Sequence, residues 1–495
     1  MKKENIILVN IIAVFGIIFS LISLVNHYEY RTYAFDLGMF NQALYSFAHL
    51  KANYFTLAID GSRVNYFADH FSLITILYAP FYYLLRTYTL LVIQIAAILA
   101  GGLGAYLFAR RETGSRYLPL FVIIQFFGIW GIYSALAFDF HNDVIAAMLV
   151  PWLALFYVTD RKKPFVIFFL LILIAKENMA IWLIFILLGL MLRRGWTHWR
   201  KFMQFEVLLI LAAAVYAVFV IGVFMPALGG SAGGSKTLVG RYALFGKSPA
   251  EIAVNIVINP RQTISMLYQS PQANSEQQAH GQDKLSLHGM VLASGGMALL
   301  AAPAYLVMLI PIYLQKMLTV DPSLWGITGQ YSIEFVPVIS LALTGFLVKL
   351  KRFKQAKRWQ YAAVAIMLAT TYGSLYYAID NGMLSFAGNV NFLSSAHYRP
   401  AVQIGEVNSL LDNIPPDAVL SVSSSIAPHL SFRDKIYLYP VIKDADYIVL
   451  MQDQRDNFVD PRQLPAGKNF RMVTRASISA DKSHSYNFYV FKRMP

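Results

Sequence analysis

The sequence predicts an α-helical, polytopic membrane protein with a small α/β domain at its C-terminal end, and three observations lead to this class. Of the 495 residues, 57% are hydrophobic and only 14% are charged, whereas a soluble domain carries about 25% charged residues. Several apolar runs reach the roughly 20 residues that a helix needs to cross a membrane. From about residue 400 the composition becomes that of a soluble domain.

The positive charge of the chain, +14 in total, predicts which loops face the cytoplasm. Much of it lies in short basic clusters between apolar runs, and such clusters mark the cytoplasmic side of a membrane protein. This distribution argues against a nucleic-acid partner. The chain has no cysteine, which excludes disulfides, thiolate metal sites and a cysteine nucleophile. The clusters cover residues 2–3, 110–116, 160–163, 193–201 and 349–358.

If all five clusters are cytoplasmic, an even number of crossings separates each neighbouring pair, and the chain is expected to have about eleven transmembrane helices. Residues 5–26 have the basic start of a signal peptide but no small-x-small cleavage site, so we expect an anchor helix. Residues 71–85 are short, aromatic and broken by Pro80, which favours a helix lying in the outer interface. The other predicted helices cover residues 88–109, 117–136, 143–159, two arms within 164–192, 204–226, 285–300, 303–318, 334–350 and 359–379.

The apolar run over residues 164–192 contains the charged triplet "KEN", Lys176 to Asn178, near its middle. A single helix would be about 43 Å long at about 1.5 Å per residue. It would also bury two charges at mid-bilayer and place a basic cluster outside. A helical hairpin avoids these difficulties. We therefore expect Lys176 and Glu177 at a turn, below the outer surface and at the floor of a cavity.

These assignments predict two domains. Residues 1–379 form the transmembrane domain, with the N-terminus in the cytoplasm, a first outer loop over 27–87 and a Gly/Ser-rich, polar outer loop over 227–284. Residues 380–495 form an extracytoplasmic α/β domain. It begins with an amphipathic helix in 401–418 and continues with short β-rich runs such as "VLSVSS" and "ADYIVLM". It contains no GxGxxG or P-loop sequence, so a nucleotide site is not indicated.

The predicted topology gathers polar residues at the outer ends of the helices, where they would line an external cavity. Each also has an ordinary structural explanation. Asp36 fits a solvated helix end, Lys176 with Glu177 fits an internal ion pair, and the "DFHND" sequence of Asp139, His141 and Asp143 fits turn or cap chemistry as well as a divalent-cation site. The residues are Asp36, Asp69, His70, Asp139, His141, Asp143, Lys176, Glu177, Tyr331 and Glu334.

Several sequences, in order over nearly the whole chain, resemble a bacterial family of multi-pass membrane proteins of unknown function that is related to the GT-C glycosyltransferases. They are "FDLGMFNQAL", "HFSLITILYAPFYYLL", "FDFHNDVIAAMLVPWLAL", "KENMA" and "IPPDAVLSVSSSIAPHLSFRDKIYLYP". In GT-C enzymes an acidic residue follows the first helix and juxtamembrane helices share its loop. Asp36 matches that acidic residue, and residues 71–85 match a juxtamembrane helix.

The resemblance implies an enzyme of the cell membrane that transfers a sugar from a polyprenyl-phosphate carrier to an acceptor on the outer face. Asp36 is then the candidate catalytic base. Lys176 is the first candidate to bind the lipid phosphate, with Arg63 or His70 as second choices. Glu177, His141, Tyr331 and Glu334 are further candidates for substrate binding. A divalent cation is a candidate cofactor, with Asp139, His141 and Asp143 as its candidate ligands.

A protein without catalytic activity is the alternative. The same cavity fits a binder of lipid-linked glycans, or a transporter that uses Lys176 and Glu177 as a coupled pair inside the membrane. A transporter is typically built from inverted repeats, and the sequence contains no convincing one.

Overall fold

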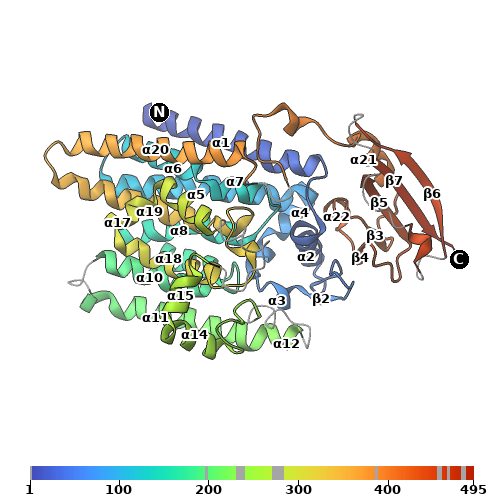
Figure 1. Ribbon diagram of the computed structural model, residues 1–495, viewed down its shortest axis with the longest axis horizontal. Coiled ribbons are helices and arrows are strands. Elements are labelled where there is room, and N and C mark those ends of the chain that lie inside the picture. Colours follow the sequence, from blue (N-terminus) through green and yellow to red (C-terminus); the bar gives the residue numbers. More distant parts are fainter. Residues whose placement is uncertain are drawn as a thin grey trace.

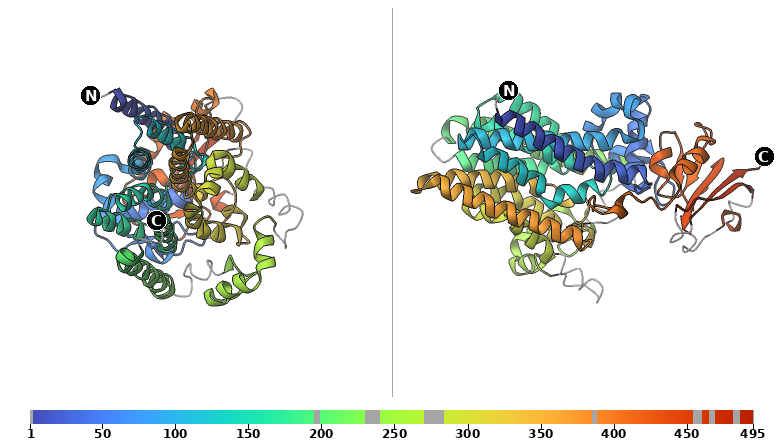
Figure 2. Two further views of the ribbon diagram at one scale, coloured as in Figure 1. Left: turned by 90° about the vertical axis from the view of Figure 1, so that its left-hand side faces the viewer. Right: turned by 90° about the horizontal axis from the view of Figure 1, so that it is seen from above.

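The computed structural model describes residues 3–194, 199–229, 240–269, 284–384, 388–453, 460–464, 469–480 and 486–494. It shows an elongated helical bundle with a sheet-containing domain beyond one of its ends (Figures 1 and 2). The predicted fold class is confirmed. The "GGSAGGS" and "SPQANSEQQAHGQDK" stretches of the predicted 227–284 loop lie largely outside the described residues.

Long helices form the bundle, and all eleven predicted segments are helical. Six described helical stretches are long and apolar enough to cross a membrane, and a seventh is the α6–α7 pair, bent by 45° at its break. Four shorter helices, α8, α9, α10 and α18, complete the set. The number of crossings remains a prediction, because α9 has only 12 residues. The helices are α1 (Lys3–Tyr28), α5 (Thr89–Thr113), α6 (Leu118–Gly128), α7 (Trp130–Leu136), α8 (Asn142–Val158), α9 (Lys162–Leu173), α10 (Met179–Arg194), α11 (Trp199–Phe219), the stretch Lys284–Ala301 ending in α17 (Met297–Ala301), α18 (Pro303–Met317), α19 (Phe335–Lys349) and α20 (Ala356–Asp380).

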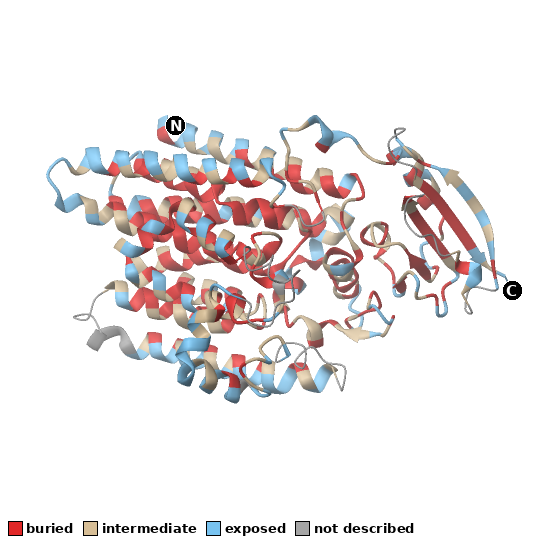
Figure 3. Ribbon diagram, viewed as in Figure 1, coloured by how far each residue is buried: buried red, intermediate tan, exposed pale blue. Residues whose placement is uncertain are grey.

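The distribution of burial within the bundle is that of a membrane protein. The central helices are buried on nearly all sides, whereas outer helices expose large apolar side chains (Figure 3). On α11, for example, Leu208, Leu211, Val215 and Val218 are all exposed. A continuous apolar surface of this kind is unfavourable in water and favourable in lipid.

Residues 164–192 form the predicted helical hairpin. Arg194, at the end of α10, pairs with Asp160, which precedes α9, so the two helices run antiparallel with Lys176 and Glu177 at the turn. Glu112, at the end of α5, pairs with Arg193. The hairpin therefore returns both basic clusters to one end of the bundle.

The other basic clusters meet at that same end. Glu4 pairs with Arg110 and Arg116, and Lys351 donates to the Glu112 carbonyl oxygen. These ion pairs link clusters that the positive-inside rule assigns to one side. They support the predicted arrangement of the helices, while the orientation of the bundle in the membrane remains a prediction.

The opposite end of the bundle carries the first outer loop, whose backbone is mostly helical. The interval 71–85 is helical as expected, and it is separated from α5 by Arg86, whose φ is +48°. The elements of the loop are η1 (Ala34–Gly38), α2 (Met39–Ala48), β1 (Tyr54–Phe55), β2 (Val64–Asn65), α3 (Tyr66–Asp69), η2 (Leu73–Tyr78), α4 (Ala79–Leu85) and η3 (Arg86–Tyr88).

Short helices also lie in the predicted 227–284 loop and around it. Ser248 caps α14 by accepting a hydrogen bond from the Glu251 amide, which stabilises a helix where the sequence suggested only a loop. These short helices are η5 (Val220–Phe224), α12 (Met225–Gly229), α14 (Pro249–Ile258), α15 (Pro260–Met266), η7 (Leu292–Gly296), η8 (Pro322–Leu324), η9 (Gln330–Ser332) and η10 (Leu350–Arg352). Four of them, η5, α14, η8 and η9, contribute side chains to a cavity described below.

The C-terminal domain is a mixed five-stranded sheet in the order β4-β3-β5-β7-β6. β3 pairs in parallel with β4 and β5, and β7 pairs antiparallel with β5 and β6. The predicted amphipathic helix is shorter than expected, since Pro415 and Pro416 follow it. The elements are η11 (Ser395–Tyr398), α21 (Ile404–Asp412), β3 (Leu420–Val422), α22 (Ala427–Leu430), β4 (Ile436–Leu438), β5 (Tyr447–Asp453), η12 (Pro461–Gln463), β6 (Phe470–Ser477) and β7 (Tyr486–Arg493).

Single cysteines should reveal the orientation of the bundle without background, because the natural chain has none. In intact cells, cysteines replacing exposed Asp60 and Asn413 should react with a membrane-impermeant maleimide. Cysteines replacing exposed Lys162 and Lys354, at the basic end, should react only after the membrane is permeabilised. Labelling of all four positions from the same side would contradict the topology.

Candidate functional site

The acidic residue that follows α1 lies in a strained turn. Asp36 has φ 68° and ψ −93° within η1, a conformation that costs a non-glycine residue on the order of 1–3 kcal/mol. The turn closes with a hydrogen bond of 3.2 Å from the Gly38 amide to the Tyr33 carbonyl oxygen. Such strain persists only where surrounding contacts fix it, and it is concentrated at functional sites.

His141 is the neighbour that holds the Asp36 side chain. Its Nε2 lies 3.1 Å from Asp36 Oδ1, and its buried ring is stacked on Phe138 with the centroids 5.3 Å apart. Burial raises the pKa of Asp36, but His141, His70 and Lys176 together outweigh that effect, so its pKa is lowered. Asp36 is therefore an anionic carboxylate at neutral pH and a hydrogen-bond acceptor.

A second acid–histidine pair lies on the same side of the bundle. His70 Nδ1 is 2.7 Å from Asp69 Oδ2, and its ring meets the edge of Phe40 with the centroids 5.2 Å apart. Burial lowers the pKa of His70, but its hydrogen bond and charge interaction with Asp69 raise it by more, so the net shift is upward. Asp69 thus favours the protonated form of His70, whose ring lies near Asp36.

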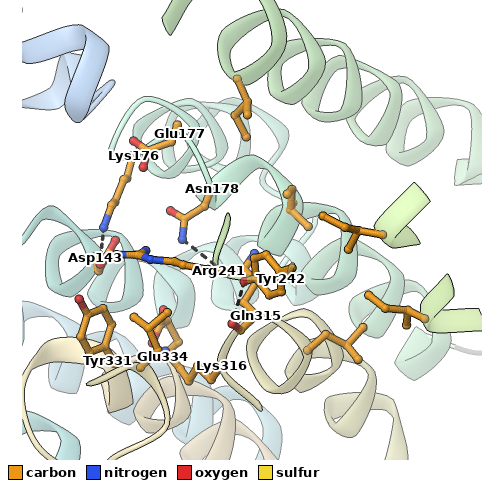
Figure 4. Close-up of a pocket in the computed structure, with 16 residues that line it drawn as sticks. Asp143, Lys176, Glu177, Asn178, Arg241, Tyr242, Gln315, Lys316, Tyr331 and Glu334 are labelled. Carbon is orange, nitrogen blue, oxygen red and sulfur yellow. Dashed lines mark hydrogen bonds and ion pairs between the residues drawn. The ribbon is translucent and has the colours of Figure 1, made fainter. Parts of the chain in front are cut away.

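A cavity of about 370 Å³ opens beside this cluster and combines charged groups with an apolar wall (Figure 4). It lies among the α9–α10 turn, α14, α18 and the segment before α19. His141 contacts Asp36, and Asp143, two residues further along the chain, lines the cavity, so the cavity and the strained turn lie close together. Its lining includes the cations Lys176, Arg241 and Lys316, the acids Asp143, Glu177 and Glu334, the aromatic residues Tyr242 and Tyr331, the amides Asn178 and Gln315, and the apolar residues Ile181, Ile221, Ile252, Ile256, Leu314 and Leu324.

Each cation of the cavity lies near a carboxylate. Lys176 Nζ is 2.8 Å from Asp143 Oδ2, and Lys316 Nζ is 3.3 Å from Glu334 Oε2. Arg241 Nε is 3.5 Å from Asp321 Oδ2, and its side chain extends towards Asp143 in Figure 4. Such neutralisation is expected where charge is removed from water, because an isolated buried ion is very costly.

Glu177 has a different role from the one its position beside Lys176 suggests. Its Oε2 accepts a hydrogen bond of 3.1 Å from the Phe71 amide, whereas the direct ion pair of Lys176 is with Asp143. An internal Lys176–Glu177 brace was one explanation of the "KEN" sequence, but adjacent residues at a turn point to different partners. Glu177 therefore ties the hairpin to the first outer loop.

The structure does not bring all the predicted binding residues to the cavity. Arg63 lies on the β1–β2 hairpin with its guanidinium 4.2 Å from the centroid of the Tyr54 ring, and it is not part of the cavity lining. Tyr331 and Glu334 line the cavity as expected, and the Tyr331 ring lies 5.6 Å from Lys316 Nζ. His70 and His141 belong to the neighbouring Asp36 cluster.

The suggested cation ligands Asp139, His141 and Asp143 face separate partners. Asp139 Oδ2 accepts a 3.0 Å hydrogen bond from the Tyr33 amide, His141 faces Asp36 and Asp143 binds Lys176. Within the described ranges no three His, Asp or Glu side chains are grouped closely enough to hold a metal ion. Their short spacing in the sequence therefore reflects a turn whose side chains diverge.

Arg241 and Lys316 are cavity residues that the sequence analysis did not select. Lys316 had a recognisable signal, since a lysine within an apolar helix is expensive and favours a functional role. Arg241 follows a Gly/Ser-rich stretch that gives no periodic pattern, so only the folded chain shows where its side chain lies.

The sequence of the chain matches a known family over residues 26–486, and the family is described as "Predicted membrane protein (DUF2079)". The chain belongs to this family. Among solved structures it is similar to the crystal structure of ArnT from Cupriavidus metallidurans bound to undecaprenyl phosphate, with 11% sequence identity and a TM-score of 0.54. The similarity covers 98% of this chain and 97% of ArnT. No curated protein matches the chain. The DUF2079 protein therefore has a GT-C-like fold, as predicted.

Removing one partner of the buried Lys176–Asp143 ion pair should destabilise the DUF2079 protein more than removing both. Lys176→Met and Asp143→Leu should each lower the apparent Tm in detergent, because breaking a buried pair costs about 3–5 kcal/mol. The double variant should recover most of the loss. Lys51→Met is the matched control, because its ion pair with Asp434 is exposed and such pairs contribute only about 0–1 kcal/mol. Additive losses in the double variant would contradict the pairing.

Proposed function

We propose that this DUF2079 protein is a glycosyltransferase of the GT-C type that transfers a sugar from a polyprenyl-phosphate carrier to an acceptor hydroxyl at the outer face of the membrane. One observation carries the proposal. A carboxylate held in a strained turn, Asp36, lies beside a cavity that joins cationic groups to an apolar wall. This is the combination that a lipid phosphate, its sugar and a base require.

Asp36 is the proposed catalytic base. An acceptor hydroxyl is a weak nucleophile, and a positioned carboxylate that takes its proton contributes about 10²- to 10⁴-fold to the rate. Asp36 is anionic, and its side chain keeps 22% of its exposure, which leaves it open to an incoming hydroxyl. His141 Nε2, 3.1 Å from Asp36 Oδ1, orients the carboxylate.

Lys176 and Arg241 are the proposed ligands of the donor phosphate. They lie on opposite segments of one cavity, Lys176 at the α9–α10 turn and Arg241 before α14 (Figure 4). The isoleucines and leucines of the cavity provide an apolar wall for the first prenyl units. The presence of undecaprenyl phosphate in the ArnT crystal structure, which shares this fold, supports a polyprenyl phosphate as the carrier.

The proposed transfer exchanges one bond of the anomeric carbon for another and moves one proton. The acceptor oxygen attacks the anomeric carbon of the sugar, and its proton passes to Asp36. The bond between that carbon and the phosphate oxygen breaks, and its electron pair stays on the phosphate, where Lys176 and Arg241 stabilise the added negative charge. The products are the glycosylated acceptor and a polyprenyl phosphate.

A detergent assay separates this proposal from the alternative of a binder or transporter. An enzyme should release polyprenyl phosphate from a radiolabelled polyprenyl-phosphate sugar in detergent micelles when an acceptor is supplied. A transporter needs a sealed vesicle, and a binder retains the intact donor. Retention of the donor without turnover, across acceptors of different chemistry, would favour the non-catalytic alternative.

Asp36→Asn should lower turnover by about two or more orders of magnitude, because the amide keeps the size of the side chain but cannot accept the proton. The apparent Tm should change little, since Asp139 and Ser424 hold the turn through its backbone amides and not through the Asp36 side chain. Asp60→Asn is the control, as Asp60 is an exposed carboxylate of the same loop. Near-normal turnover by a folded Asp36→Asn protein would remove Asp36 as the base.

Arg241→Gln should raise the KM for the donor about tenfold or more, because a charge-assisted contact to a phosphate is lost. Arg261→Gln is the matched control, since Arg261 is an exposed arginine on α15 and is not part of the cavity lining. The measurement is initial rate against donor concentration for both variants. An equal change in both variants would indicate a general effect of surface charge and exclude a specific phosphate contact.

A further inference from the structure

We infer that the strained turn carrying Asp36 is held from two sides, by the Asp139 carboxylate of the bundle and by the Ser424 hydroxyl of the C-terminal domain, and that both are positioning residues for the catalytic carboxylate. The inference rests on the proposed role of Asp36. It assigns the C-terminal domain a part in catalysis that is separate from any binding of the acceptor.

The bundle holds the turn through Asp139. Its carboxylate accepts a hydrogen bond of 3.0 Å from the Tyr33 amide. Tyr33 begins the turn, and its carbonyl oxygen accepts the hydrogen bond from the Gly38 amide that closes the turn, so Asp139 fixes the residue at which the turn both starts and closes. Asp139 itself has φ +55°, and the Gln94 side chain holds its backbone with a 2.8 Å hydrogen bond to the Asp139 carbonyl oxygen.

The C-terminal domain holds the same turn through Ser424. Its Oγ accepts a hydrogen bond of 3.1 Å from the Ala34 amide. Ser424 lies just after β3, at the carboxyl end of the parallel part of the sheet, and its neighbour Ser423 anchors this segment by accepting a hydrogen bond from the Met451 amide of β5. The sheet therefore fixes the position of Ser424, and Ser424 in turn fixes the Ala34 amide of the turn.

These contacts account for a conformation that the chain alone disfavours. Asp36 is neither glycine nor asparagine, and its φ of 68° with ψ −93° is stable only where the flanking amides are fixed. Asp139 fixes the Tyr33 amide and Ser424 fixes the Ala34 amide. Removal of either acceptor would let the turn relax and move the Asp36 carboxylate away from His141.

The Ser424 contact is separable from the attachment of the domain. Other contacts join the domain to the first outer loop: Gln42 donates to the Arg433 and Asp434 carbonyl oxygens, and Thr56 Oγ1 bonds with both the amide and the carbonyl oxygen of Ile436. Loss of one hydroxyl leaves these contacts in place. A substitution at Ser424 therefore tests the turn and leaves the domain docked.

Donor kinetics in detergent test the inference. Ser424→Ala should lower kcat about 10- to 100-fold with little change in the KM for the donor, because a displacement of about 1 Å has that effect on a positioned group. Ser424→Thr keeps the oxygen and should restore most of the rate. Ser425→Ala, one residue further along, is the control. An unchanged kcat in Ser424→Ala, with the wild-type protein active, would overturn the inference.

Hydrogen–deuterium exchange gives a readout that does not depend on activity. In Ser424→Ala and Asp139→Ala, peptides covering residues 33–38 should exchange about tenfold faster or more, while peptides from β3, β5 and α5 keep the wild-type rate. Unchanged protection of residues 33–38 in both variants would show that Asp139 and Ser424 do not hold the turn. If exchange is faster in the variants but the wild-type protein has no transferase activity, the two residues do hold the turn and the proposed function is refuted instead.

Discussion

The docking of the first outer loop between the bundle and the C-terminal domain is the constraint on which the candidate site depends. Tyr30, Ala34 and Leu57 of this loop belong to the apolar core of the C-terminal domain, whereas Leu37, Phe40 and Leu44 belong to the core of the bundle. The loop is therefore shared by two cores. A loop fixed on both faces can hold a strained turn that a loop exposed to water would lose to more favourable conformations.

The charges of the cavity follow from the cost of placing ions near the membrane. Lys176, Lys316 and Arg241 each have a carboxylate nearby, so none of these three cations of the cavity is uncompensated. A phosphate entering the cavity would compete with Asp143 or Asp321 for the same cations. Such competition favours release of a charged product. A cation that can return to its carboxylate partner loses less interaction energy when the phosphate leaves.

The sequence predicted most of the helices because membrane crossing imposes length and hydrophobicity on them, and basic clusters mark their ends. Arg194 and Asp160 meet as the hairpin prediction requires. β6 was not predicted: residues 470–477 expose every second side chain, as an edge strand with one open face does, but the exposed positions include Val473 as well as Arg471 and Arg475, so the sequence has no regular polar and apolar alternation. The helix α14 was also missed, because its Ser248 cap lies within a segment whose composition is that of a loop.

Side-chain partners were predicted less well than helices, for a physical reason. Charge patterns tell which side of the membrane a residue faces, but hydrogen-bond geometry decides which neighbour it meets. Lys176 and Glu177 are adjacent in sequence yet bind Asp143 and Phe71, and Asp139, His141 and Asp143 diverge from one short turn. Ser424 gave no signal at all, because its partner is a backbone amide 390 residues away. Contacts between residues so far apart in the sequence depend on how whole domains dock. The residues that position the candidate base are therefore recognised only in the folded protein.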